Sequence, residues 1–281
     1  GPFLFSNGII IWYVKEIEPH LGLSGIFSNQ NYAGTWLATI WPFSLGFIFL
    51  NKQNKYKQIA SIILLGITTL TLILTTSRNA LLGILISIPI IAGLKSLFVL
   101  ISILIVLILI FIFQSYLPFA KEFLSLFISL FPDQLIDKFN KLGFIKILEF
   151  RRINLWANSF NLISKKPIFG LGAAFFPFLY KIYYQPTNYT EQHTHNLFLE
   201  LAASYGFIVS LIIIGFISSL IFLGLKSINK KQVDYPEKIV SKSWIAATIV
   251  VVLSQMNDIT YYDGRISIIF WILLAGVKNM I

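Results

Sequence analysis

The chain has 281 residues, of which 56% are hydrophobic and 12% are charged, and its mean hydropathy is +0.77. Soluble domains carry about 25% charged residues, so this composition excludes an ordinary soluble protein. The formal net charge of +10 does not require nucleic acid, because lysines that set membrane topology and bind anionic headgroups account for it. The absence of cysteine excludes disulfides, thiolate chemistry and cysteine-type zinc sites.

The beginning of the chain is unusual, because Gly1 and Pro2 stand where an initiator methionine is expected. The apolar stretch 3–14 is too short to span a bilayer. Gly-Pro is also what a protease scar leaves behind. We expect a fragment of a larger helical bundle whose upstream helices are missing.

Uncharged apolar runs recur along the rest of the chain, with lengths near the roughly 20 residues that cross a hydrocarbon core. They show no short alternation of the kind found in outer-membrane strands. We therefore expect an all-α polytopic membrane protein, with one membrane domain over residues 1–281 and about seven transmembrane helices. The expected spans are 32–50, 59–76, 80–94, 96–117, 197–225, 244–256 and 266–280.

The lysines of the short loops predict the orientation of these spans. The short loops 51–58 and 95, and the stretch 226–242, are rich in lysine, so we expect them on the cytoplasmic side. Residues 29–31, 77–78, 118–195 and 258–265 then share the external face. Every chemically interesting residue falls on that one face, which predicts a single site.

The long external loop, 118–195, is not expected to be a mere linker. Residues 119–131 and 138–163 have apolar side chains at helical spacing with lysine and arginine between them. This pattern is typical of amphipathic helices that lie on a membrane surface. Pro132 and Pro167 are expected to end these two helices.

His193 and His195 stand at the end of this loop, directly before the apolar run 197–225. Ionisable groups at that depth are functional candidates, and imidazole is well suited to proton transfer near neutral pH. The alternative is an interfacial histidine that hydrogen-bonds a loop carbonyl. Glu191 lies nearby, but no metal-ligand pattern follows the pair, so we expect no bound metal and no cofactor.

Three arginines are candidates for binding a phosphate group. Arg78 is the only charged residue between Lys57 and Lys95, and a guanidinium suits bidentate contact with phosphate. Arg152 shares a helical stripe with Trp156, which predicts that it points inward, whereas Arg151 lies about 100° away. The alternative for all three is anchoring to lipid headgroups.

Several further residues are expected to support the site or the fold. Gly170 and Gly172, in the turn after Pro167, permit close backbone approach, although no strand precedes them as a nucleotide cradle requires. Asn29 and Asn31 are expected to form an ordinary N-cap of the first span. Among the polar groups at later helix ends, which include Glu200 and Asp258, Asp263 and Arg265 are expected to pair with each other.

The ordered set of motifs resembles the O-antigen ligase and O-antigen polymerase-related membrane proteins. The resemblance covers about residues 25–206, and each of its motifs is short. They are Phe27-Ser28-Asn29-Gln30-Asn31, Ser77-Arg78-Asn79-Ala80, Arg152-x-x-x-Trp156 running into Pro167-Ile168-Phe169-Gly170-Leu171-Gly172, and His195-Asn196 followed after nine residues by Gly206. The tail, with Asp258, Tyr261-Tyr262-Asp263-Gly264-Arg265 and Trp271, is similar to cyanobacterial members labelled bicarbonate transporters.

This resemblance implies glycan transfer from a polyprenyl-diphosphate carrier to a hydroxyl of a glycan, lipid or protein acceptor, at the outer face of the bacterial inner membrane. His195 matches the family's essential histidine, and Arg78 and Arg152, with Arg151 beside them, match arginines that hold the donor diphosphate. His193, Asn196, Asn29, Asn31, Gly170 and Gly172 support them. Two arginines stabilise a diphosphate leaving group without a metal, and a neutral imidazole is a suitable base for a hydroxyl.

Two other functions remain open from the sequence: a transporter of a small anion such as bicarbonate, and an inactive truncated relative. Transport favours charged residues near the middle of the membrane and broken helices, whereas the charges here gather at one face. The sequence does not separate a ligase from a polymerase, and it does not decide which of His193 and His195 is the base.

Overall fold

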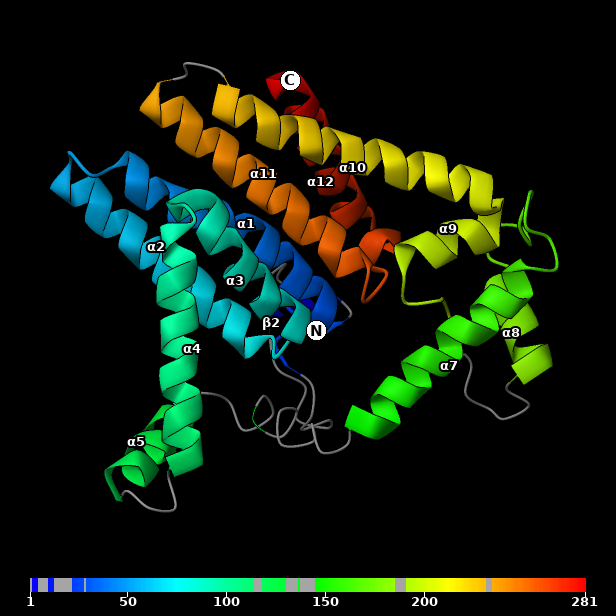
Figure 1. The fold of residues 1–281 in the computed structure, drawn as a ribbon, viewed down its shortest axis with the longest axis horizontal. Coiled ribbons are helices and arrows are strands. Elements are labelled where there is room, and N and C mark those ends of the chain that lie inside the picture. Colours follow the sequence, from blue (N-terminus) through cyan, green and yellow to red (C-terminus); the bar gives the residue numbers. More distant parts are fainter. Residues whose placement is uncertain are drawn as a thin grey trace. The chain divides into compact units, whose positions relative to one another are not determined.

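The computed structural model describes residues 2–4, 10–12, 22–27, 29–113, 118–129, 136, 145–184, 191–230 and 234–281. Eleven α-helices make up most of these described residues, which confirms the expected helical class (Figure 1). Two three-residue strands, β1 (Pro2–Leu4) and β2 (Ile10–Trp12), pair antiparallel. The chain forms two compact units, one from Gly1–Asn140 with Gln232–Val250 and the other from Lys141–Lys231 with Val251–Ile281.

The first unit is built around three helices that follow one another in the chain. Its helices are α1 (Gln30–Leu50), α2 (Lys55–Leu74), α3 (Arg78–Ala92), α4 (Lys95–Phe113), α5 (Pro118–Ser129) and the part of α11 (Tyr235–Gln255) up to Val250. Helix α1 packs against both α2 and α3 (Figure 1). Ala38, Leu72, Ala80 and Val250 form a buried core between them.

Small residues let these helices approach closely. A Cβ atom on Gly34 would lie 2.6 Å from the Cβ of Ser77, and one on Gly83 would lie 2.9 Å from a methyl group of Val250. Helices in a membrane gain little from the hydrophobic effect on packing, and close van der Waals contact at small residues replaces it. The packing of this unit is therefore suited to a lipid environment.

Three helices are long and apolar enough to cross a membrane among the described residues: Gln30–Leu50, Lys55–Leu74 and Phe207–Ile228. Arg78–Ala92 and Lys95–Ile110 are shorter apolar helices. Helix α12 (Gly264–Met280) has 17 residues and rises about 26 Å at 1.5 Å per residue, less than the roughly 30 Å of a hydrocarbon core. Seven spans and their orientation therefore stay predictions.

The second unit contains the histidine pair. Its elements are α7 (Ile145–Ile163), α8 (Phe176–Tyr184), α9 (Leu197–Tyr205), α10 (Phe207–Lys230), the end of α11, the 3-10 helix η2 (Thr260–Tyr262) and α12. Helix α7 packs against α8 and α9, and α10 packs against α9 and α12 (Figure 1). The buried core of the α7–α9 group consists of Leu155, Leu162, Ile163, Phe176, Tyr180, Ala202 and Ala203.

The expectation of one span over 197–225 is wrong, because the apolar run is broken into α9 and α10 at Gly206. Gly206 has φ of +89°, a conformation that favours glycine, and a side chain there would overlap the Ile168 carbonyl. A Cβ on Gly170, which also has positive φ, would lie 2.7 Å from the Gly206 nitrogen. The two glycines therefore let the turn after Pro167 pack backbone to backbone against the helix break.

Two backbone hydrogen bonds join these segments. The Leu171 N–H donates to the Ala203 carbonyl at 2.6 Å, and the Phe207 N–H donates to the Pro167 carbonyl at 2.8 Å. One carbonyl and one N–H that the interrupted helix leaves without an intrahelical partner are thereby satisfied. The glycine-rich turn consequently has a packing role in this fold.

The two helices expected within 118–195 are found as α5 and α7, while their place on a membrane surface and the external side of this segment stay predictions. Helix α7 begins at Ile145, and residues 138–144 and Pro132 lie outside the described residues. The sequence did not predict α8, a nine-residue helix with aromatic side chains. Its Phe176 and Tyr180 are buried in the core, so α8 is part of the second unit's packing.

Candidate functional site

The short segment 191–196 carries the histidine pair and leads into α9. Asn196 is the N-cap of that helix: its Oδ1 accepts the Leu199 N–H at 3.2 Å. Its Nδ2 donates to the Met256 carbonyl at 3.2 Å, just beyond the end of α11. Asn196 therefore ties the histidine segment to the segment after α11.

His195 is held by a carboxyl group from that second segment. Its Nδ1 lies 3.0 Å from Oδ1 of Asp258, whose side chain is only 8% exposed. A carboxyl group that accepts the Nδ1 proton fixes the tautomer and leaves the Nε2 lone pair available. The sequence predicts only that Asp258 is a polar group near a helix end. It does not predict the contact with His195, because His195 and Asp258 are 63 positions apart.

A second carboxyl group flanks the other ring nitrogen of His195. Oε2 of Glu191 lies 3.6 Å from Nε2, which is longer than an ordinary hydrogen bond. The Glu191 side chain is 6% exposed, whereas the His195 side chain is 26% exposed. The imidazole is thus accessible to solvent while the two acids beside it are buried.

The backbone at His195 is also unusual, with φ of +53°. This left-handed conformation is uncommon for a residue with a side chain. Such conformations persist where the surrounding structure fixes them, and they cluster at functional sites. The cap at Asn196 and the contact with Asp258 provide that fixation.

Glu200, in the first turn of α9, fixes the position of Thr194 in the middle of segment 191–196. One of its carboxyl oxygens accepts the Thr194 N–H at 2.9 Å, and the other accepts the Tyr262 hydroxyl at 2.7 Å. Glu200 is buried, and burial together with Glu200 raises the pKa of the Tyr262 phenol well above its usual range. Sequence reasoning missed both partners, which lie 6 and 62 positions from Glu200.

His193 lies between His195 and Tyr262. Its ring centroid is 4.3 Å from that of His195 in an edge-on arrangement, and its plane is nearly parallel to the Tyr262 ring at 6.3 Å. Burial, and secondarily His195, lower the pKa of His193. Its Nδ1 is buried and has no hydrogen-bond partner among the described residues.

His193, His195 and Asp258 together could hold a metal ion. One possible ligand atom from each lies within 4.8 Å of the others. The sequence does not predict this set of three, because the third possible ligand comes from a distant segment, and the expectation of no bound metal stays a prediction. The local pattern around the histidines carries no sign of it.

Helix α7 contacts the same segment. The indole Nε1 of Trp156 donates to the Thr194 carbonyl at 3.1 Å. Arg152 lies one turn earlier on the same stripe of the helix and is half-buried. This arrangement places Arg152 on the stripe of α7 that reaches the histidine segment.

The expectation that this stripe forms the inward face of α7 is wrong in part. The buried positions of α7 are Leu155, Ser159, Leu162 and Ile163. Ile163 belongs to the Arg152 stripe, but Phe160 of the same stripe is 52% exposed. Both stripes are apolar enough to be buried, so periodicity alone does not choose between them. Arg151 precedes Leu155 by one turn, and its side chain lies outside the described residues.

Arg78 belongs to the first unit, where it begins α3 and is exposed. A guanidinium at a helix N-terminus adds its charge to the positive end of the helix dipole, a combination that attracts anions. Ser77 precedes it as the N-cap residue, and its buried hydroxyl has no hydrogen-bond partner among the described residues. The expected cap of α1 is confirmed, since the Asn31 N–H donates to Oδ1 of Asn29 at 2.8 Å.

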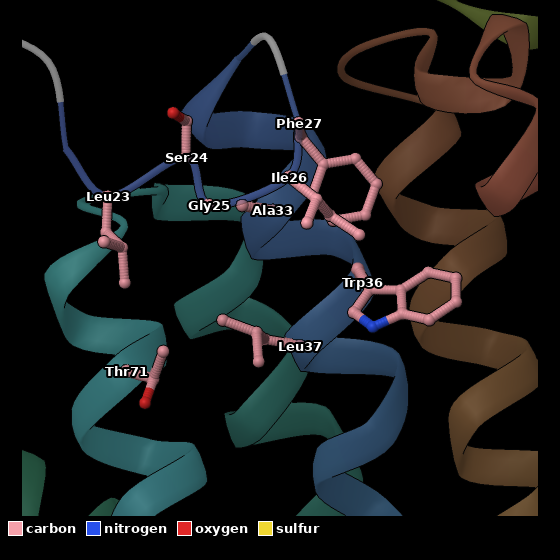
Figure 2. Close-up of a pocket in the computed structure, with 9 residues that line it drawn as sticks. All are labelled: Leu23, Ser24, Gly25, Ile26, Phe27, Ala33, Trp36, Leu37 and Thr71. Atoms are coloured by element: carbon pink, nitrogen blue, oxygen red, sulfur yellow. The ribbon is translucent and has the colours of Figure 1, made fainter. Parts of the chain in front are cut away.

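A small apolar pocket also lies in the first unit, near the beginning of α1 (Figure 2). Its volume is about 180 Å³, below the roughly 300 Å³ of typical ligand sites. Phe27 and Trp36 line it with ring centroids 5.8 Å apart. The other lining residues are Leu23, Ser24, Gly25, Ile26, Ala33, Leu37 and Thr71.

The expected pair at the beginning of α12 is confirmed. An oxygen of Asp263 lies 2.6 Å from the Arg265 guanidinium, and the same carboxyl group caps the helix. The hydrogen bonds from Arg265 hold the pKa of Asp263 below its usual range. This pair is local, because its two members are two positions apart.

The fold and the site together define a protein of apolar helices with a fixed histidine–carboxyl cluster beside them. A family model described as O-antigen ligase matches residues 59–214, which is 156 of the 281 residues. The chain therefore belongs to the O-antigen ligase family. No curated protein matches the chain.

The matched region contains Arg78, Arg152, His195 and the glycines of the α9–α10 break. Asp258 lies outside it. Membership in this membrane-integral family supports glycan transfer of the O-antigen ligase kind at the level of the family.

Proposed function

We propose that this protein transfers a glycan from a polyprenyl-diphosphate-linked donor to a hydroxyl acceptor at the outer face of the bacterial inner membrane. His195 acts as the base and needs no metal for this step. The family membership supports the reaction class, and the contact between His195 Nδ1 and Asp258 at 3.0 Å supports the choice of base.

The chemistry assigns a separate task to each nitrogen of the His195 ring. Asp258 accepts a hydrogen bond from the Nδ1–H group and thereby keeps the proton on Nδ1. Nε2 is then free to accept a proton from the acceptor hydroxyl. The acceptor oxygen forms a bond to the anomeric carbon of the donor sugar, with inversion. The bond from that carbon to the diphosphate oxygen breaks, and its electron pair leaves with the diphosphate.

The growing negative charge on the diphosphate requires cations. Arg152 is half-buried on the α7 stripe that carries Trp156, whose indole bonds to the residue between the two histidines. Arg78 is exposed and forms no ion pair within the described residues, which suits a residue that binds an anionic ligand. Guanidinium groups make paired hydrogen bonds to phosphate that an ammonium does not reproduce.

His195 is preferred over His193 as the base because of its partners. Each of its ring nitrogens faces a carboxyl group and its side chain is partly exposed, whereas His193 stacks on Tyr262 and has a buried, unbonded Nδ1. His193 is then a supporting residue, together with Asn196. Asn29 and Asn31 support the beginning of α1, and Gly170 and Gly172 support the packing of the second unit.

The experiment compares transfer and donor binding in membranes that contain the full protein. His195→Ala is expected to lower transfer about a hundredfold or more while donor binding changes little. Arg78→Ala and Arg152→Ala are expected to weaken both, because phosphate contacts act in ground and transition states alike. Full transfer by the His195→Ala protein, or transfer that is lost with chelator and restored by metal, contradicts the proposal.

The proposal also requires Arg78 and His195 to reach one substrate. The chain contains no cysteine, so spin labels on cysteines introduced at the exposed neighbouring positions Leu82 and Gln192 report this separation without background and leave Arg78 and His195 in place. A separation that stays above roughly 15 Å with donor bound contradicts a shared diphosphate-sized substrate.

A further inference from the structure

The histidine segment and the segment after α11 bring three metal-binding side chains together. His193 and His195 each offer a ring nitrogen and Asp258 offers a carboxylate oxygen, all within 4.8 Å of one another. Two imidazoles with one carboxylate form a ligand set that proteins use for Zn²⁺ and for other divalent transition metals. We propose that these three residues form a binding site for such an ion, with Zn²⁺ as the representative.

The unpaired ring nitrogen of His193 is an independent observation in favour of this site. Its Nδ1 is buried and has no hydrogen-bond partner among the described residues. Buried polar atoms in native proteins nearly always have a partner, and an ion not yet accounted for is one explanation of an exception. A metal ion bound by His193 would supply a partner for the ring.

The spacing between His195 and Asp258 fits an ion as well as a proton. The 3.0 Å between Nδ1 and Oδ1 is close to the distance between neighbouring ligands around an ion with bonds of about 2.0–2.2 Å. Binding of the ion therefore displaces the proton on Nδ1, which leaves to solvent, and no electron is transferred. The ion and the proton compete for the same pair of atoms.

Neighbouring residues hold the possible ligand side chains in place and leave the site accessible to ions from solution. Thr194, between the two histidines, is held by Glu200 through its N–H and by Trp156 through its carbonyl. Partners that orient ligands in this way strengthen a metal site. The His195 side chain is 26% exposed, so an ion from solution has access to it.

An ion at this site would block the base proposed above, and this consequence rests on the proposed function. His195 bound through Nδ1 loses the contact with Asp258 that fixes its proton. Zn²⁺ would therefore inhibit glycan transfer rather than support it. The site itself does not depend on that function, since binding is measured without a substrate.

The test uses the purified full chain in detergent, stripped with a chelator and titrated with Zn²⁺ in a calorimeter. We expect one Zn²⁺ per chain, and an affinity about tenfold or more lower in His193→Gln and in Asp258→Asn. His20→Gln is the matched control, because it removes the third histidine of the chain and should bind as the unchanged protein does. X-ray absorption at the zinc edge of the unchanged protein should show two imidazole ligands.

Three results would overturn the site: no uptake of Zn²⁺ by the unchanged protein, an affinity in both ligand variants equal to that of the unchanged protein, or a spectrum without imidazole. The absorption spectrum decides the matter even if a variant folds poorly. An unchanged protein that transfers glycan but takes up no Zn²⁺ would defeat only this inference, whereas an unchanged protein that binds Zn²⁺ but never transfers glycan would defeat only the proposed function.

Discussion

The two units that carry candidate residues differ in how they hold these residues. In the second unit, His195 is surrounded by fixed partners: Asp258 and Glu191 flank its ring, and Asn196 caps the next helix. In the first unit, Arg78 is exposed at the start of α3 and forms no ion pair in the part of the chain that the structure describes. A base needs a defined tautomer and therefore a built environment, whereas a phosphate-binding cation needs access to its ligand.

The largest expected effect comes from removing the charge that orients His195. Asp258→Asn should lower glycan transfer about a hundredfold or more, because an amide no longer holds the proton on Nδ1. Asp263→Asn is the matched control, since Asp263 pairs locally with Arg265. Transfer rates in membranes check both, and an Asp258→Asn protein as active as the control would remove the distinction between the two regions.

The helix break should have the next largest effect. Gly206→Ala places a side chain against the Ile168 carbonyl at a positive φ, and it should lower the free energy of unfolding by about 2 kcal/mol or more. Gly215→Ala, in the middle of α10 with open space around it, should be neutral or stabilising by up to about 1 kcal/mol. Thermal unfolding in detergent measures both, and equal melting temperatures would show that the backbone contact does not stabilise the second unit.

The exposed arginine should affect binding more than folding. Arg78→Ala should weaken donor binding about tenfold or more through the loss of charged hydrogen bonds, and Arg78→Lys should recover little of it. Lys95→Ala is the control, because Lys95 is also exposed at the first position of a helix. If both alanine variants bind donor equally well, Arg78 is a headgroup anchor and not part of a site.

The smallest effect is expected at Tyr262, which contacts Glu200 and His193. Tyr262→Phe removes the hydroxyl that donates to the buried Glu200, which should cost about 1 kcal/mol of stability and lower transfer less than about tenfold. Tyr261→Phe is the control, since the Tyr261 hydroxyl accepts from Trp271 instead. A loss of transfer as large as that of Asp258→Asn would make Tyr262 a direct participant.

The sequence predicted what is local. Long apolar runs gave the positions of α1 to α4 to within a few residues, and the Asn29 cap and the Asp263–Arg265 pair follow from residues two positions apart. It did not predict the partners of the site, which join residues 38, 62 and 63 positions apart. Single-residue patterns carry no signal for such pairings.

Two predictions made from the sequence about the helices failed for the same reason. The break at Gly206 was missed because the apolar run continues through it without a change of composition. The inward face of α7 was predicted only in part, because buried positions occur on both the Arg152–Ile163 stripe and the Leu155–Leu162 stripe, and only tertiary packing determines which positions are buried.

Chemical rescue of a His195 variant measures most directly whether His195 is the base. His195→Gly removes the imidazole and suits the positive φ of 53° at this position, so the loop is not strained by the change. The account predicts that this protein transfers glycan at least about a hundredfold more slowly, and that added imidazole restores part of the rate, whereas it does not restore Arg78→Ala. Transfer by His195→Gly at the rate of the unchanged protein would contradict the assignment of His195 as the base.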